Sequence, residues 1–293
     1  MTRRPHVLIS NDDGVNAPGL VALAACLREE NFCDFSICGP SGERSGQSHS
    51  INIHRALHAF PIPPLGAKEA WAVDGTPADA VMLALYGPIL QDNAVDLVVS
   101  GINRGDNLGL HVIYSGTVGA AREAACKGVP ALAFSLDSHV ARSVEAFEEA
   151  ARHSARLIRA LLNINLPLAA PRGYCLARQG VHCARPRFED ATVLDAAVSE
   201  AAAVSGGEHA HGLRAFNNLI GETQVDDAEG TDSWAVRRGW IAVCPIGLAS
   251  DVPATAAAAV ARTDPALLDA LRRGLAQLAA AEGLEVLIAD TRE

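Results

Sequence analysis

The sequence is poor in aromatic residues, paired cysteines and positive charge. Aromatic residues make up only 4% of the 293 residues, too few to identify a platform on which a base would stack. The seven cysteines are scattered without a Cys-x-x-Cys spacing, which excludes the paired-cysteine motifs and favours small buried side chains. The formal net charge of −10 argues against a broad electrostatic surface for duplex nucleic acid.

Long apolar segments are also absent. Polar residues interrupt the apolar and alanine-rich stretches well before membrane-spanning length, so we expect no transmembrane helix and no membrane partner. The basic first residues run directly into an apolar segment without a small-residue cleavage site, and we therefore expect a cytoplasmic location. Because 49% of the residues are hydrophobic, the chain can bury a core of one large domain or one and a half.

Short apolar segments alternate with helical patterns along most of the chain. The patterns predict strands at 6–9, 35–38, 94–100, 131–135 and 240–243, and helices at 18–27, 77–85, 117–127 and 145–162. Such alternation is typical of an α/β protein. We expect a Rossmann-like, doubly wound and mostly parallel sheet in a three-layer α/β/α arrangement.

The alternation weakens after about residue 167. Residues 184–230 lack sustained periodicity, which predicts an extended arm or hairpin. His209 and His211 could share one strand face there, but without further ligands we treat them as solvated. We therefore divide the chain into an α/β core at 1–183, an arm with a returning strand at 184–254 that subunits could exchange, and a C-terminal helix at 255–293.

Two adjacent aspartates, Asp12 and Asp13, follow the first predicted strand. Adjacent carboxylates repel each other and usually need a cation. Gly14 permits a sharp turn and Pro18 can begin a helix, so the segment is predicted to be a strand, a turn and a helix. In an open parallel sheet such a turn lies at the carboxyl ends of the strands, where ligands bind. The alternative is that Asn11, Asp12 and Asp13 merely cap the helix and form the turn.

Further polar loops follow other predicted strands. Ser45 lies among glycines and hydroxyl or amide side chains, Asn103 follows the strand at 94–100, and Ser115 and Thr117 stand at a helix start that favours an anion. Each of these residues also has an ordinary interpretation as a turn former or cap. Because parallel strands end at one edge, together they predict a phosphate site with a hard cation such as Mg²⁺ or Mn²⁺.

Several longer motifs carry a resemblance to a known family. They read SNDDGVNAPGL, ERSGQSHSI, DGTPADAV, DLVVSGINRGDNLG, YSGTVGAA and TDSWAVRRGWIAVCPI. In this order they resemble the SurE survival proteins, which are metal-dependent nucleotidases of the α/β type. The resemblance implies one divalent ion per subunit, held by Asp12, Asp13, Ser45 and Asn103. It also implies a homodimer or homotetramer, and a phosphate surrounded by Asn107, Ser115, Gly116 and Thr117.

The expected reaction is hydrolysis of a nucleoside monophosphate or related small phosphomonoester, as in a 5′-nucleotidase, with the 3′ position left open. The ion would activate water and offset charge on the phosphoryl oxygens, while Asp13 orients the water and Arg104 assists. One alternative makes Asp12 a nucleophile that forms an aspartyl phosphate. Another is a nucleotide-sensing protein on the same fold that has lost turnover.

The sequence departs from the family pattern at three positions. Asp106 stands where proline is usual, His111 where an acid is common, and Arg122 where the residue is typically apolar. None is a predicted metal ligand, but each could alter substrate preference. His111 could act as a general acid or simply cap its loop. Tyr114 is the nearest candidate for contact with a base, although a tyrosine beside a helix start is more often a supporting residue.

Overall fold

The chain consists of two compact units. The first comprises Met1–Val181 with Asp226–Glu293, and the second comprises His182–Val225. The computed structural model describes residues 4–90, 94–158, 163–166, 173–177, 183–190, 216–224, 227–244 and 285–288, with 272, 273, 275, 276, 279 and 280. The three-part division inferred from the sequence stays a prediction.

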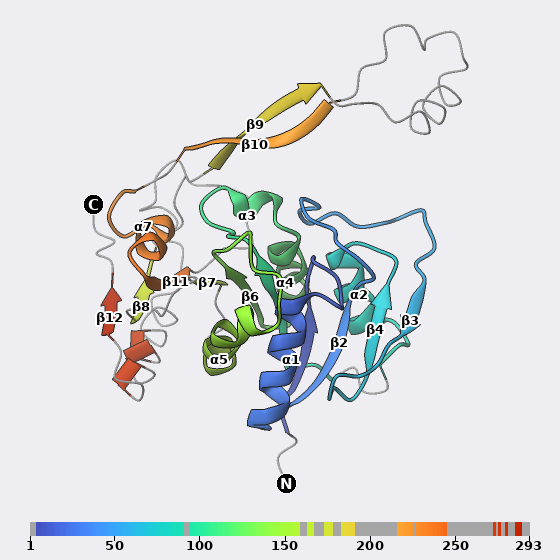
Figure 1. Cartoon of the computed structure of the whole chain (residues 1–293). Coiled ribbons are helices and arrows are strands. Elements are labelled where there is room, and N and C mark those ends of the chain that lie inside the picture. Colours follow the sequence, from blue (N-terminus) through green and yellow to red (C-terminus); the bar gives the residue numbers. More distant parts are fainter. Residues whose placement is uncertain are drawn as a thin grey trace, which may run out of the picture. The chain divides into compact units, whose positions relative to one another are not determined.

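A 10-stranded sheet runs through the first unit in the order β12-β8-β11-β7-β6-β5-β1-β2-β4-β3 (Figure 1). Its strands are β1 (His6–Ser10), β2 (Asp34–Pro40), β3 (Ala59–Pro61), β4 (Ala70–Val73), β5 (Leu97–Arg104), β6 (Ala131–Leu136), β7 (Asn163–Leu166), β8 (Gly173–Leu176), β11 (Trp240–Cys244) and β12 (Glu285–Ile288). All neighbours pair in parallel except β3 with β4 and β7 with β11. The prediction of a mostly parallel sheet is confirmed.

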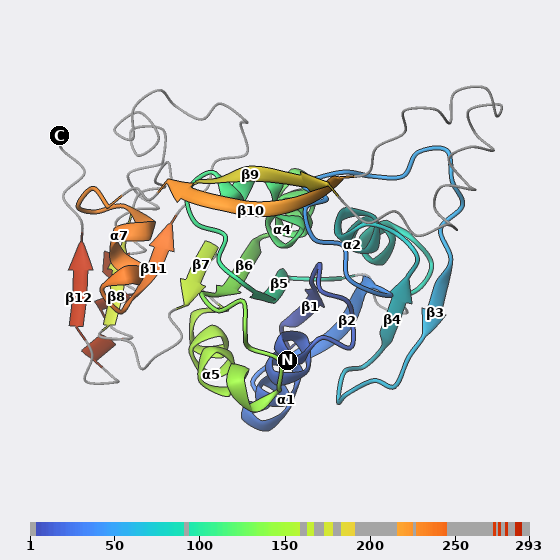
Figure 2. The same ribbon diagram turned by 45° about the horizontal axis from the view of Figure 1, so that its top comes forward.

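Helices cover both faces of the sheet, as Figure 2 shows for α1 and α5 on one side and α2 and α4 on the other. The helices are α1 (Pro18–Glu30), α2 (Pro77–Tyr86), α3 (His111–Tyr114), α4 (Gly116–Cys126), α5 (Glu148–Leu157) and α7 (Asp232–Arg237), with a 3₁₀ turn at Glu145–Phe147. Leu23 and Phe147 lie in the core under α1 and α5, and Val81 and Ala120 lie in the core under α2 and α4. The three-layer α/β/α arrangement is therefore confirmed.

The ends of α1 and α2 follow from local chemistry. Proline begins both helices, where its missing N–H costs nothing. Asn31 ends α1 in the left-handed region, with φ of 49°. Thr76 and Asp79 form a capping box at the start of α2, in which each side chain accepts from the other residue's backbone N–H. These signals explain why both helices begin where the sequence predicts.

Two predicted elements end elsewhere. The strand expected at 94–100 is β5, which begins at Leu97 and continues to Arg104, so Asn103 is part of a strand rather than of a loop. The pairing of β5 with β6 shifts register between Ser100 and Asn103. The strand therefore continues past Gly101. The helix expected at 145–162 opens as a 3₁₀ turn and α5 ends at Leu157, while 159–162 lie outside the described residues.

The second unit contains an antiparallel hairpin of β9 (Cys183–Asp190) and β10 (Phe216–Gln224), with a register shift between Ile220 and Thr223. It lies in the segment where the sequence predicts an arm or hairpin. His209 and His211 lie outside the described residues, as does most of the C-terminal helix predicted at 255–293. Among the described helices, none is long and apolar enough to cross a membrane.

Candidate active site

The sheet places the predicted ligands where its strand order reverses. From β1 the chain proceeds to β2 and β4 on one side and returns to β5 on the other side of β1. In open α/β sheets, ligands bind outside the carboxyl ends of the strands at such a switch point. Asp12 and Asp13 follow β1 almost directly, and Asn103 and Arg104 are the last residues of β5.

The two aspartates do not cap α1. The residue before the helix is Ala17, which makes no side-chain cap bond. The turn is instead made by Asn11, whose side chain donates to Gly14 O at 2.8 Å and accepts from Gly14 N at 3.2 Å. The acids are therefore available for another role. The sequence alternative, in which Asn11 helps to form this turn, is therefore confirmed for Asn11.

The Asp12 carboxylate lies against the start of α4. Its Oδ1 accepts a hydrogen bond from the Thr117 hydroxyl, and the residue is only 3% exposed. A Cβ added to Gly116 would stand 2.8 Å from Asp12 Cβ and 3.0 Å from Asp12 Oδ2. The helix start carries partial positive charge, which favours the carboxylate there. Three predicted site residues, Asp12, Gly116 and Thr117, thus meet directly.

Burial raises the pKa of the Asp12 carboxyl from 3.8 to about 6, because an ionised group is poorly solvated there. The Thr117 hydrogen bond lowers this pKa and the charge of Asp13 raises it further. The pKa of Asp13 is also raised by burial, against the opposing effect of Arg104. The hydrogen bonds and ion pairs of the described residues give Asp12 no cationic partner. Two such acids fit a divalent cation with oxygen ligands.

Arg104 connects Asp13 with the loop that carries Ser45. The Arg104 backbone N–H donates to Asp13 Oδ2 at 2.9 Å, and the guanidinium Nη2 lies 3.6 Å from Glu43 Oε2. The Ser45 hydroxyl donates to Glu43 Oε1 at 3.2 Å. Glu43 therefore contacts both Ser45, a predicted ligand, and Arg104, whose positive charge lowers the pKa of Asp13. The sequence did not single out Glu43.

Among the described residues, the Ser45 hydroxyl bonds to Glu43 and not to either aspartate carboxylate. It is exposed, and its neighbour Arg44 donates its backbone N–H to Asp12 O at 2.7 Å. Ser45 is thus adjacent in sequence to a residue that touches the aspartate segment. Because its hydroxyl donates to Glu43, the lone pairs of the oxygen are still available to a cation.

The remaining predicted residues are held by neutral hydrogen bonds. Asn103 is 8% exposed and donates from Nδ2 to Gly105 O at 2.9 Å. Asn107 is 5% exposed and donates from Nδ2 to Ser135 Oγ at 2.6 Å. Ser115 Oγ caps α4 by accepting from Val118 N at 3.1 Å. The cap interpretation of Ser115 therefore holds, and its hydroxyl hydrogen still allows it to donate to a ligand.

Asp106 and His111, which the sequence singles out separately, contact each other. His111 Nδ1 lies 3.0 Å from Asp106 Oδ1, which also accepts from Leu108 N at 3.1 Å. This hydrogen bond raises the pKa of His111. The nearby Asp232 accepts from Gly109 N at 3.0 Å. The arrangement closes the loop between β5 and α3, and Asp232 is a contributor that the sequence did not identify.

The four predicted ligands must have donor atoms that suit a hard cation such as Mg²⁺. No group of three or more His, Cys, Asp or Glu side chains among the described residues could hold a metal. The predicted set contains only two such side chains because its other members are a hydroxyl and an amide. Hard cations such as Mg²⁺ commonly keep several waters and bind through one or two carboxylates, so the set remains chemically adequate.

Comparisons with known proteins decide the family. The model of the family described as survival protein SurE matches residues 7–186 of this chain. The chain belongs to the SurE family. A relative from Thermus thermophilus, named 5'-nucleotidase SurE 1, is 38% identical over 255 residues, covering 83% of this chain and 92% of the relative.

Two other SurE proteins are also similar to this chain. The 5'-nucleotidase SurE of an Anaeromyxobacter species is 45% identical over 185 residues, which is 60% of this chain and 68% of that protein. The crystal structure of the SurE protein from Aquifex aeolicus is similar with a TM-score of 0.65 and 30% identity, covering 85% of this chain and 95% of that one. The family predicted from the motifs is confirmed.

The buried Asp12 carboxyl predicts a pH-dependent stability of the metal-free protein. Its folded pKa of about 6 exceeds the ordinary 3.8, so the folded state holds the proton more tightly than the unfolded state. The resulting contribution to the free energy of unfolding is present below about pH 4 and is lost as pH rises through about 6. The free energy of unfolding declines by roughly 3 kcal/mol over this range. Urea unfolding of the Asp12→Asn variant should show a smaller decline than the wild type. Parallel pH profiles of the two proteins would contradict the expectation.

Proposed function

We propose that this SurE-family protein hydrolyses nucleoside monophosphates to a nucleoside and phosphate, as a metal-dependent phosphomonoesterase. The observation that carries the proposal is the pair of adjacent aspartates at the switch point of the sheet. One of them is buried against a helix start, with no cationic partner among the described residues. Its relatives are named 5'-nucleotidases, which supports the same reaction for this chain.

We assign Asp12, Asp13, Ser45 and Asn103 as the ligands of one Mg²⁺ or Mn²⁺ per subunit. When bound, the ion supplies Lewis acidity, lowers the pKa of water and offsets charge on the phosphoryl group. Asp12 accepts from Thr117 through Oδ1 only, which leaves Oδ2 for the ion. Ser45 donates its hydroxyl hydrogen to Glu43, which leaves the lone pairs of its oxygen for the ion.

The chain's own residues then bind and orient the substrate. Asn107, Ser115, Gly116 and Thr117 would donate to the equatorial phosphoryl oxygens, because the start of α4 presents N–H groups and partial positive charge. Asp13 would orient the attacking water, held in place by its bond to the Arg104 N–H. The Arg104 guanidinium, 29% exposed at the side chain, adds positive charge at the same edge.

We also propose that the protein works as a homodimer or homotetramer in the cytoplasm, without nucleic-acid or membrane partners. The β9–β10 hairpin supports the oligomer, because a two-stranded hairpin is only marginally stable by itself in water. Packing against a second copy would stabilise it. Sedimentation of the purified protein would distinguish these assemblies from a monomer.

A phosphate-release screen tests the function directly. Nucleoside monophosphates and sugar phosphates are offered with Mg²⁺, with Mn²⁺ or with a chelator. We expect release from nucleoside monophosphates only when an ion is present. Nucleotide binding without release for any ion would instead favour the sensing protein.

The same preparation separates two chemical routes. Labelled solvent oxygen found in the phosphate, without a trapped phosphoenzyme, supports direct attack by water. A phosphoenzyme on Asp12 would replace that route with the nucleophilic one.

A further inference from the structure

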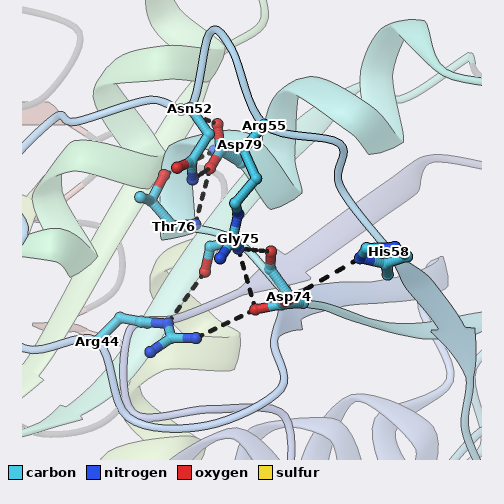
Figure 3. A network of polar contacts seen from close by, with 8 residues as sticks. All are labelled: Arg44, Asn52, Arg55, His58, Asp74, Gly75, Thr76 and Asp79. Atoms are coloured by element: carbon cyan, nitrogen blue, oxygen red, sulfur yellow. Dashed lines mark hydrogen bonds and ion pairs between the residues drawn. The ribbon is translucent and has the colours of Figure 1, made fainter. Parts of the chain in front are cut away.

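Ser45 lies on a loop that is fastened to the turn between β4 and α2. We call residues 44–55 the ligand loop. Figure 3 shows Asp74 of this turn and Asp79 of the first turn of α2 at the centre of the contacts to this loop. The DGTPADAV motif thus supplies more than the start of a helix.

Asp74 holds both ends of the ligand loop. Its Oδ1 lies 3.4 Å from Arg44 Nη2 and 3.0 Å from Arg55 Nη2. Arg44 Nε also donates to Gly75 O at 3.3 Å. His58 Nδ1 lies 3.9 Å from the other carboxylate oxygen (Figure 3). The half-exposed Asp74 carboxylate therefore contacts Arg44, Arg55 and His58, which come from separate parts of the preceding chain.

Asp79 and Thr76 fix the middle of the loop. Asp79 is fully buried and accepts from Asn52 N and Thr76 N, each at 2.9 Å (Figure 3). The Thr76 hydroxyl donates to Ser50 O at 2.6 Å. Because Asp79 also belongs to the capping box of α2, its replacement would disturb the fold. Asp74 has no part in that box and can be changed more cleanly.

The opposite side of the loop lies on α3 and on α4, and the start of α4 carries Gly116 and Thr117. Ser48 N donates to Tyr114 O at 2.9 Å, and Ser48 Oγ donates to Ile113 O at 2.6 Å. A Cβ on Gly119 would stand 2.0 Å from Ser48 O, so the loop backbone rests on α4. Arg44 is where the contacts converge, since its backbone bonds Asp12 and its side chain bonds Asp74.

We infer that Asp74 is a positioning residue for the metal site, because its hold on Arg44 and Arg55 keeps Ser45 within reach of an ion on Asp12 and Asp13. The inference rests on the proposed function, which makes Ser45 a ligand. A loop that is already held loses less conformational freedom when its hydroxyl binds the ion. A looser loop would weaken metal binding and leave turnover at saturating metal nearly unchanged.

Asp34 offers a matched control. Its side chain is 31% exposed against 38% for Asp74, and it also takes two cations, Arg4 Nε at 3.3 Å and Lys68 Nζ at 3.0 Å. It stands at the first residue of β2, at the amino end of the parallel strands. Asp34→Asn therefore removes a comparable pair of contacts at the edge away from the ligands.

The experiment measures binding of Mn²⁺ alone to the full chain by electron paramagnetic resonance. Asp74→Asn should bind Mn²⁺ about fivefold more weakly than the wild type, as expected for the loss of partly exposed ion pairs. Asp74→Glu should recover most of the affinity, and Asp34→Asn should keep all of it. Activity assays should show a raised metal requirement for Asp74→Asn, with kcat at saturating Mn²⁺ within about twofold of the wild type.

Two outcomes would overturn the inference. Equal Mn²⁺ affinity of Asp74→Asn and Asp34→Asn would contradict a positioning role while leaving the proposed function intact. A wild type that binds no Mn²⁺ would refute the proposed function as well.

If Arg44 transmits the effect of Asp74, the double variant Arg44→Gln with Asp74→Asn should bind Mn²⁺ no more weakly than Asp74→Asn alone. Additive losses in the double variant would contradict this route.

Discussion

Asp12→Asn should abolish nearly all metal-dependent phosphate release while the protein remains folded. Asparagine keeps the shape of the side chain and an oxygen that can accept from Thr117. It removes the negative charge that the ion requires. We expect kcat/KM to fall about a thousandfold, the scale of losing a principal source of transition-state stabilisation. Phosphate release from a nucleoside monophosphate, with Mn²⁺ stripped and then restored, measures the effect.

The control for this variant is again Asp34→Asn, which changes the same kind of charge at the other edge of the sheet. Circular dichroism should show that both variants keep the secondary structure of the wild type. At neutral pH without metal, Asp12→Asn should even be more stable, because a neutral amide is easier to bury than a carboxylate. Turnover of Asp12→Asn close to that of the wild type would rule out Asp12 as a ligand.

Gly116→Ala should reduce turnover about a hundredfold, because misplacement of a catalytic group by roughly 1 Å can cost that much. The added methyl would stand 2.8 Å from Asp12 Cβ and 3.1 Å from Pro77 Cγ, so the Asp12 side chain must move. Alanine favours a helix over glycine by about 1 kcal/mol, which limits any loss of stability. Steady-state assays over a range of Mn²⁺ concentrations measure the loss.

Gly42→Ala is the matched control, since its Cβ would meet nothing within 4 Å and its φ lies outside the left-handed region. It should retain the activity of the wild type. If Gly116→Ala were as active as Gly42→Ala, the close contact between α4 and Asp12 would have no role in catalysis. Thermal unfolding of both variants separates an effect on the site from an effect on the fold.

Much of the core was predictable because its signals are local. The apolar run at 6–9, followed by Gly14 and Pro18, specifies a buried strand, a turn and a helix within a few residues. The proline and capping box of α2 are local in the same sense. The position of the acids at the switch point then follows from parallel topology.

Other features depend on contacts between distant segments and could not be read from the sequence. The extension of β5 through Asn103 depends on its shifted pairing with β6, and nothing in the polar GINR run predicts a strand. The bonds of Ser45 to Glu43 and of Asp74 to Arg44 depend on how the loop folds back on its neighbours. The pairing of Asp106 with His111 is similar, because the motifs draw attention to each residue without indicating that the two are in contact.

We expect one divalent ion to be held by Asp12, Asp13, Ser45 and Asn103. Anomalous diffraction from crystals grown with Mn²⁺ is the direct test of this ligand set, because the ion identifies its own position. The anomalous peak should lie at the carboxyl ends of β1 and β5, coordinated by oxygens of these residues. Crystals saturated with Mn²⁺ that show no peak there, or show these side chains directed to separate places, would contradict it.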